Sequence, residues 1–187
     1  MEKSAQGITG VKAAASRRRL LFVAAILAGL APALPAAAQK VAAPAVDGTV
    51  KGQFGDWQVV CKAPPPGAKR EICAVTQSVT DESNDNVGLT VMVQNFEKEQ
   101  VLRVMAPLGV LLPRNLALKI DEADLGQVPF MRCFVVGCQA QISIDDALRK
   151  RLTTGKTALF VIFRTEEQGI GIPISLAGLP EALAALK

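Results

Sequence analysis

Histidine and tyrosine are absent from the 187-residue chain, which has one tryptophan and only 4% aromatic residues. Without histidine, the chain cannot build a Ser-His-Asp triad, a Cys-His dyad, a histidine general base or a histidine-ligated metal site. These absences remove the commonest catalytic arrangements. We therefore expect no enzymatic activity and no cofactor.

Carboxylates are the catalytic groups that this composition still permits. Two Asp or Glu side chains that face each other across a cleft act as acid and base in glycosidases. The acidic residues of this chain lie mainly in turns, where solvation explains them better. A histidine-free hydrolase remains an alternative, and the positions of the carboxylates in a structure would test it.

The first 38 residues have the pattern of an export signal. Lys12 and Arg17-Arg18-Arg19 precede a short apolar run at 20–34, and Ala36-Ala37-Ala38 fits the small-residue rule for cleavage. The apolar run is too short for a comfortable membrane span. We therefore expect residues 1–38 to be a signal peptide that is cleaved near Ala38. The mature chain would then be periplasmic or secreted, without a transmembrane segment.

The export route stays open. Sec export is the common case, and the arginine run also loosely resembles a twin-arginine signal.

The positive net charge of the chain belongs to this signal. The whole chain has 21 basic and 17 acidic residues; residues 1–38 hold five of the basic ones and one acidic one, which leaves 16 of each sign. A neutral mature chain gives no reason to expect a nucleic-acid partner.

The densest positive stretch of the mature chain is Arg149-Lys150-Arg151, between Leu148 and Leu152 on a predicted helix. Such a run is usually a solvated helix surface. It is also the first place to look for a bound polyanion or lipid surface.

Four cysteines, Cys61, Cys73, Cys133 and Cys138, lie in the predicted mature chain. An even number in an exported chain favours two disulfides over a metal site. Three connectivities are possible. Closeness in sequence favours Cys61–Cys73 and Cys133–Cys138.

Trp57 lies in phase with Val59 and Cys61 on a predicted strand, so the three side chains share one face. A second strand, 72–79, returns after the proline-rich stretch at 64–67. We expect Trp57 to anchor the core beside a Cys61–Cys73 bridge. The alternative is an exposed residue that stacks on a ligand.

Short alternating runs separated by turns continue to the C-terminus, with few helical segments between them. Residues 127–133 read as a strand at an edge or with a bulge, because Pro129 lies inside it. Residues 157–164 are continuously apolar and predict a central strand buried on both faces. The pattern Ser143-x-x-Asp146 predicts the start of a short helix that ends at Gly155, and Pro180 fits the first turn of a closing helix.

This pattern predicts an all-β fold, an antiparallel β-sandwich that is immunoglobulin-like in architecture, with two short helices and two local disulfides. We expect a flexible lead-in at 39–52 and the sandwich domain at 53–187.

The landmarks of the chain resemble a known family, the invasion-associated locus B proteins of Gram-negative bacteria. The matching stretches follow one another through the mature chain: Trp57-Gln58-Val59-Val60-Cys61, Cys73 with Gln77, Pro107-Leu108-Gly109, Ile120-Asp121, Pro129-Phe130 before Cys133, Gly137-Cys138, and Pro173-Ile174-Ser175-Leu176 with Ala182-Leu183. The resemblance implies an exported sandwich-type domain with two local disulfides, and it offers no catalytic residues.

Three functions follow as hypotheses. The resemblance favours an exported, non-enzymatic interaction protein of the envelope or the exterior, with an unknown protein or envelope partner and a role in host-cell interaction. The first alternative is a periplasmic module that binds a small ligand or a polypeptide. The histidine-free hydrolase is the second.

Overall fold

The computed structural model describes residues 46–64, 66–67, 70–82 and 87–186. The predicted signal peptide at 1–38, its cleavage site near Ala38 and the lead-in as far as residue 45 lie outside the described residues.

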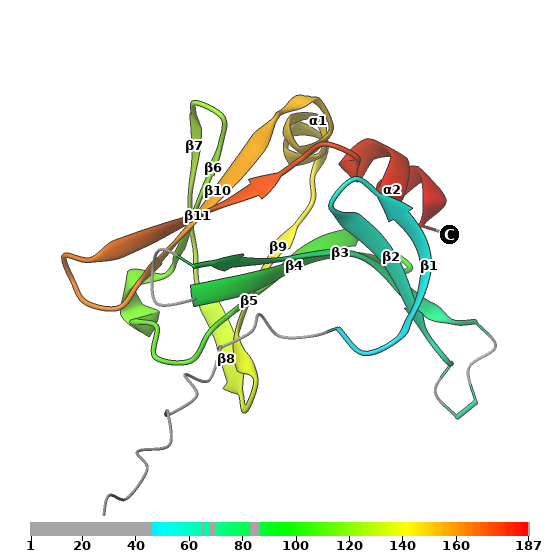
Figure 1. Cartoon of the computed structure of the whole chain (residues 1–187), viewed down its shortest axis with the longest axis horizontal. Coiled ribbons are helices and arrows are strands. Elements are labelled where there is room, and N and C mark those ends of the chain that lie inside the picture. The colour runs from blue at the N-terminus through cyan, green and yellow to red at the C-terminus, as the bar shows by residue number, and fades with distance from the viewer. Residues whose placement is uncertain (1–45, 65, 68–69, 83–86, 187) are drawn as a thin grey trace, which may run out of the picture. The chain divides into compact units, whose positions relative to one another are not determined.

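The larger sheet, sheet A, has seven antiparallel strands in the described part of the chain (Figure 1). Five consecutive strands form a meander, and two later strands, in reversed order, extend it. In spatial order they are β1 (Thr49–Phe54), β2 (Trp57–Lys62), β3 (Ile72–Asp81), β4 (Val87–Asn95), β5 (Gln100–Ala106), β9 (Gly137–Ser143) and β8 (Phe130–Phe134).

The smaller sheet, sheet B, is antiparallel and covers one face of sheet A. Its described strands, in spatial order, are β11 (Gly169–Ser175), β10 (Thr157–Phe163), β6 (Leu116–Ile120) and β7 (Ala123–Val128). The other elements are a 3₁₀ turn η1 (Leu112–Arg114) and the helices α1 (Asp146–Thr154) and α2 (Leu179–Ala185).

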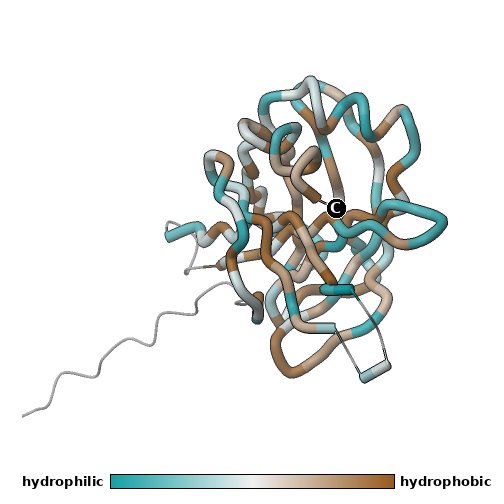
Figure 2. The backbone as a smooth tube through the Cα atoms, turned by 90° about the vertical axis from the view of Figure 1, so that its right-hand side faces the viewer, coloured by the Kyte–Doolittle hydropathy of each residue, from teal (hydrophilic) through white to brown (hydrophobic). Residues whose placement is uncertain are grey.

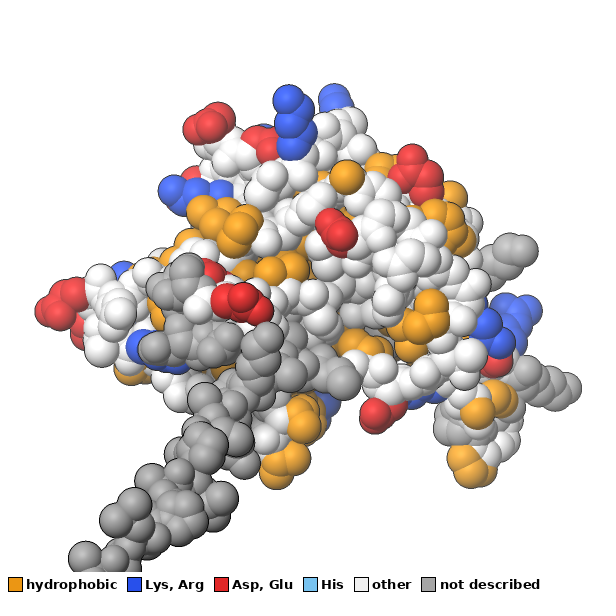
Figure 3. All heavy atoms as spheres, viewed as in Figure 1, with side chains coloured by type: hydrophobic (Ala, Val, Ile, Leu, Met, Phe, Trp, Pro, Cys, Tyr) orange, Lys and Arg blue, Asp and Glu red, His pale blue; other side chains and the backbone are white. Residues whose placement is uncertain are grey.

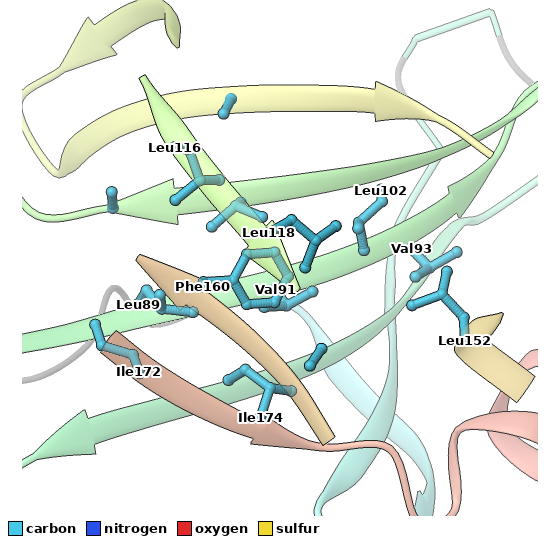
Figure 4. Close-up of a cluster of buried hydrophobic side chains, with 14 of the residues drawn as sticks. Leu89, Val91, Val93, Leu102, Leu116, Leu118, Leu152, Phe160, Ile172 and Ile174 are labelled. Atoms are coloured by element: carbon cyan, nitrogen blue, oxygen red, sulfur yellow. The ribbon is translucent and has the colours of Figure 1, made fainter. Parts of the chain in front are cut away.

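The core lies between the two sheets because alternate residues of each strand point inward. Leu89 and Val91 of β4 face Phe160 of β10, whose ring lies in the middle of the cluster in Figure 4. In Figure 2, brown hydrophobic segments run through the middle of the domain, and several projecting loops are teal. The predicted antiparallel β-sandwich with two short helices is confirmed. The likeness to immunoglobulin domains lies in the two layers, since β1 to β5 form a meander.

Strand β1 begins inside the stretch that was expected to be a flexible lead-in. The lead-in was predicted to run to Gly52, but Thr49 already pairs with Cys61 and Val50 with Val60. β1 is an edge strand with mostly exposed side chains, so it has no apolar alternation for sequence reasoning to find. The first strand in the described part of the chain therefore begins at Thr49, inside the predicted lead-in.

Strand β10 is central in its sheet, as expected, but is buried on only one face. Ala158, Phe160 and Ile162 are buried, whereas the residues between them are half-buried. Long side chains cover that outer face in part: the Arg114 guanidinium lies 4.5 Å from the centroid of the Phe163 ring. The continuous apolar run of β10 therefore corresponds to one fully buried face and one face that neighbouring side chains cover in part.

Pro129 separates two strands where the sequence predicted one. β7 ends at Val128 in sheet B and β8 begins at Phe130 in sheet A. Both are edge strands, as a proline in a strand requires, because its nitrogen has no hydrogen to donate. Pro129 is the corner at which the chain passes from one sheet to the other.

The first turn of α1 is capped by Asp145, and the capping pair predicted from Ser143 and Asp146 is wrong. The Asp145 carboxylate accepts a hydrogen bond from the Leu148 amide at 2.7 Å. Ser143 still belongs to β9, where its hydroxyl donates to the Glu99 carboxylate at 2.7 Å. A cap residue must have extended backbone geometry directly before the helix, and Asp145 has it.

Trp57 is 1% exposed and lies at the start of β2, between the two sheets. Its indole N–H donates to the backbone carbonyl of Ser175 in β11 at 2.8 Å. One side chain therefore joins sheet A to sheet B both by packing and by a directed bond.

We expect Trp57→Ala to lower the free energy of unfolding by about 3–5 kcal/mol, because it empties a large buried volume. Trp57→Phe keeps most of that volume and loses the bond to Ser175, so its cost should be smaller. Denaturant unfolding of the oxidised protein measures both values. Blue-shifted emission that iodide quenches poorly should accompany them, and red-shifted emission with unchanged stability in Trp57→Ala would contradict a core position.

Candidate interaction surface

Both disulfides join residues that lie directly opposite each other in antiparallel strands. Cys61 of β2 pairs with Cys73 of β3 in register, with a Cα–Cα distance of 4.0 Å. Cys133 of β8 and Cys138 of β9 do the same at 3.9 Å. The expected two local disulfides are thus present in the fold, and no cysteine is free.

One cluster of metal-ligating residue types occurs in the part of the chain that the structure describes. It consists of Cys61, Glu71 and Cys73. The two sulfurs are bonded to each other, so neither offers the thiolate that a metal ion needs. Glu71 is instead in ion-pair distance of Lys51, at 3.3 Å.

The basic run Arg149-Lys150-Arg151 lies exposed on α1, while Leu152 of the same helix is buried. Asp146 in the first turn and Arg151 in the last complement the helix dipole. In Figure 1, α1 lies at the opposite end of the domain from the turn of the β8–β9 hairpin. The run forms a solvated helix face, and its binding role stays a prediction.

Two hollows flank Arg151. The first has a volume of about 240 Å³ and an apolar wall that includes Leu125 of β7 and Ile142 of β9, with Asp145 and Arg151 also lining it. The second, of about 280 Å³, lies between Arg151 and the turn at Asp121 and Glu122. Both are smaller than the usual 300–1,000 Å³ of small-molecule sites.

Three carboxylates accept hydrogen bonds from backbone amides. Asp121 accepts hydrogen bonds from the amides of Lys156 and Thr157 at 3.0–3.2 Å. Asp124 accepts from the Gly126 amide at 2.8 Å, and Asp145 caps α1. These three groups hold turns and a helix end, which are structural tasks.

The turn of the β8–β9 hairpin exposes an apolar cluster that the sequence analysis did not single out. Val135 is 93% exposed, and Val136 and Phe134 beside it are exposed by 59% and 39%. We call these three residues the hairpin tip. Met131, which is 60% exposed, lies in β8 on the other side of Cys133 from the turn. Figure 3 shows hydrophobic side chains gathered at the end of this hairpin.

Two arginines lie on the same sheet as the hairpin tip, Arg132 in β8 and Arg103 two strands away in β5. The Arg132 guanidinium lies 4.8 Å from the centroid of the Phe134 ring. Arg103 of β5 donates to the side chains of Gln141 and Gln94 at 2.9 and 2.6 Å. Burial lowers the pKa of Arg103, and the positive charge of Arg132 lowers it further.

A signal for the hairpin tip was present in the sequence. A hairpin turn normally holds Gly, Asn, Asp, Ser or Pro, whereas Phe134-Val135-Val136 places three apolar residues before the only glycine. A short loop between paired cysteines must be a turn, so its apolar side chains have little to pack against. Joining those two facts would have predicted their exposure.

The comparisons with known proteins agree with one another. The model of the family "Invasion associated locus B (IalB) protein" matches residues 57–187. Invasion protein B homologues of Brucella abortus strain 2308 and of biovar 1 strain 9-941 are each 26% identical over 137 residues, which cover 72% of this chain and 78% of theirs. The crystal structure of invasion associated protein B from Bartonella henselae is similar in fold, with a TM-score of 0.61 and 20% identity over 73% of this chain and 94% of that one.

We expect the two disulfides to stabilise the fold unequally. In the chain-entropy model, removing Cys61–Cys73 by a double Ser substitution costs about 3 kcal/mol, and removing Cys133–Cys138 costs about 2 kcal/mol because its loop is shorter. Denaturant unfolding of the two double variants beside the oxidised parent measures the difference. Non-reducing peptide mapping checks the connectivity, and a Cys61–Cys138 peptide would contradict it.

Proposed function

The chain belongs to the invasion-associated locus B family, and from that membership we propose that it is an exported, disulfide-bonded interaction protein without enzymatic activity. It acts at the cell envelope or outside the cell. Contact with host cells is part of the proposal because its relatives carry the name invasion protein B.

Export is supported by two independent features. Residues 1–38 have a basic segment, an apolar segment and a small-residue cleavage site, in that order. Both cysteine pairs are bonded, and structural disulfides persist in oxidising compartments such as the periplasm and the exterior.

The absence of enzymatic activity is supported by composition and by the tasks of the carboxylates. The chain has no histidine to act as a base. Asp121, Asp124 and Asp145 hold backbone amides, as a structural carboxylate does.

The observation that carries the interaction role is the hairpin tip. Exposed apolar side chains that stand together mark contact sites more often than single ones do. The Cys133–Cys138 bond closes the hairpin directly below the tip, so the turn is held in one shape before it meets a partner. Preorganisation of this kind lowers the entropic cost of binding.

The binding of a small ligand or a short polypeptide segment is the second candidate function. It is favoured by the hollow between α1, β7 and β9, which has an apolar wall and one charged group of each sign. Its volume of about 240 Å³ suits a single apolar side chain or a short alkyl group.

Fractionation of cells that produce the full chain tests the first proposal. The mature protein should begin at Gln39 and should associate with the envelope or with host cells. Val135→Asp should release it into the soluble fraction, because it places a charge where apolar contact is needed. Ile72→Asp is the matched control: Ile72 is an aliphatic residue, 50% exposed, and lies next to a cysteine of the other disulfide.

Retention of the full-length chain in the cytoplasm would contradict export. Equal association of Val135→Asp, Ile72→Asp and the parent would contradict an interaction through the hairpin tip.

A further inference from the structure

The hairpin tip projects from the end of sheet A. It lies at the turn between β8 and β9, at the end of sheet A, and Val135 is almost fully exposed. Leu108 follows β5 just beyond Ala106, which pairs with Cys138, and it is also exposed. A convex apolar end of this kind needs a partner that can close around it.

The residue types of the tip fit contact with the interior of a lipid bilayer better than contact with a folded protein. Protein–protein hot spots are rich in Trp, Tyr and Arg, and valine is under-represented in them. The tip offers two valines and a phenylalanine, none of which has a side-chain hydrogen-bonding group. The interior of a bilayer requires no directed bonds and adapts its shape to what enters it.

The charges around the tip favour an anionic surface. Residues 125–144 contain no acidic residue, and their one charged residue is Arg132, which stacks on Phe134. Asp47 lines the hollow beside Val136, but its carboxylate lies 3.8 Å from Lys62 Nζ, so this pair adds little net charge.

The depth of insertion is limited by the backbone of the hairpin. β8 is an edge strand, so the amides and carbonyls on its outer side have no ladder partner in the sheet. Such groups cannot enter the hydrocarbon region without a large desolvation cost. Only the turn can enter, and Arg132 then reaches the level of the lipid phosphates.

We propose that the hairpin tip inserts shallowly into the surface of a bilayer that contains anionic lipids, with Val135 and Val136 in the acyl boundary and Arg132 at the phosphates. This inference rests on the proposed function and names the partner of the same surface. The contact is peripheral. No helix among residues 46–186, in the part that the structure describes, is long and apolar enough to cross a membrane.

Flotation of the purified, oxidised mature protein with large unilamellar vesicles tests the proposal. Vesicles of phosphatidylcholine with phosphatidylglycerol should carry the protein upward, and vesicles of phosphatidylcholine alone should carry less. Val135→Asp should lower the partition coefficient by at least about tenfold, because it removes the burial of one aliphatic side chain and adds a charge. Ile72→Asp should stay within about twofold of the parent, since it loses similar apolar area away from the hairpin tip.

A fluorescent variant reports the insertion directly. Val135→Trp adds an exposed indole to a chain whose own Trp57 is buried, so a change on adding vesicles comes from the tip. Its emission should shift to the blue with anionic vesicles and should be quenched by lipids brominated near the head group. Arg132→Gln should lower partition onto the anionic vesicles and leave partition onto neutral ones unchanged.

Four results would overturn the inference: no flotation of the parent protein, equal partition of Val135→Asp and the parent, equal losses in Val135→Asp and Ile72→Asp, or equal partition onto neutral and anionic vesicles. The outcome separates this inference from the proposed function. If association with cells depends on Val135 while pure vesicles bind nothing, the partner is a protein; the proposed function then stands and the lipid assignment falls.

Discussion

The contact between Trp57 and Ser175 is the point on which the sandwich depends. Apolar packing between the sheets is non-directional, whereas this indole N–H makes a directed bond across the buried layer. The approach is possible because the neighbouring chain segments come very close: Gly178, with φ of +86°, lies against the backbone carbonyl of Phe54. A side chain at Gly178 would push the β1–β2 hairpin away from the segment between β11 and α2. Trp57 and Gly178 therefore act together: both hold the β1–β2 hairpin against the segment that follows β11.

The two disulfides apply a second constraint, at the ends of sheet A. An edge strand has ladder partners on one side only, so it loses its pairing more easily than a central strand. Cys61–Cys73 joins the second and third strands from one edge, and Cys133–Cys138 joins the edge strand β8 to its neighbour at the other. The middle of the sheet, β4 and β5, has no such bond and contributes the fully buried Leu89 and Leu102. One covalent bond thus fixes the edge strand β8, and the other fixes the buried pair β2 and β3 next to the opposite edge strand β1.

Sequence reasoning found the features that leave a periodic or chemical trace. Alternation placed Trp57 and Cys61 on one face, and the same register brings Cys61 opposite Cys73. It failed where contacts between segments that are far apart in the sequence decide the local structure. β1 is exposed and so shows no alternation, Asp145 is a cap only because β9 ends just before it, and on the outer face of β10 Arg114 from a distant segment covers Phe163. For the candidate surface, the sequence contained both signals, the apolar residues at 134–136 and the short loop between paired cysteines, and the exposure of the hairpin tip follows only when the two are combined.

The fold does not require apolar residues in the hairpin tip, and their exposure carries a risk of aggregation. An exposed apolar turn on an edge strand invites aggregation, because it offers both apolar area and open backbone groups. A polar turn would serve the Cys133–Cys138 hairpin equally well, since Val135 packs against almost nothing. The chain instead keeps the apolar residues and limits the hazard: the disulfide stops the strands from slipping, and Arg132 places a charge on the exposed edge beside Phe134. The chain keeps an aggregation-prone turn and also limits its risk. Contact with a partner explains this combination better than a contribution to the stability of the fold does.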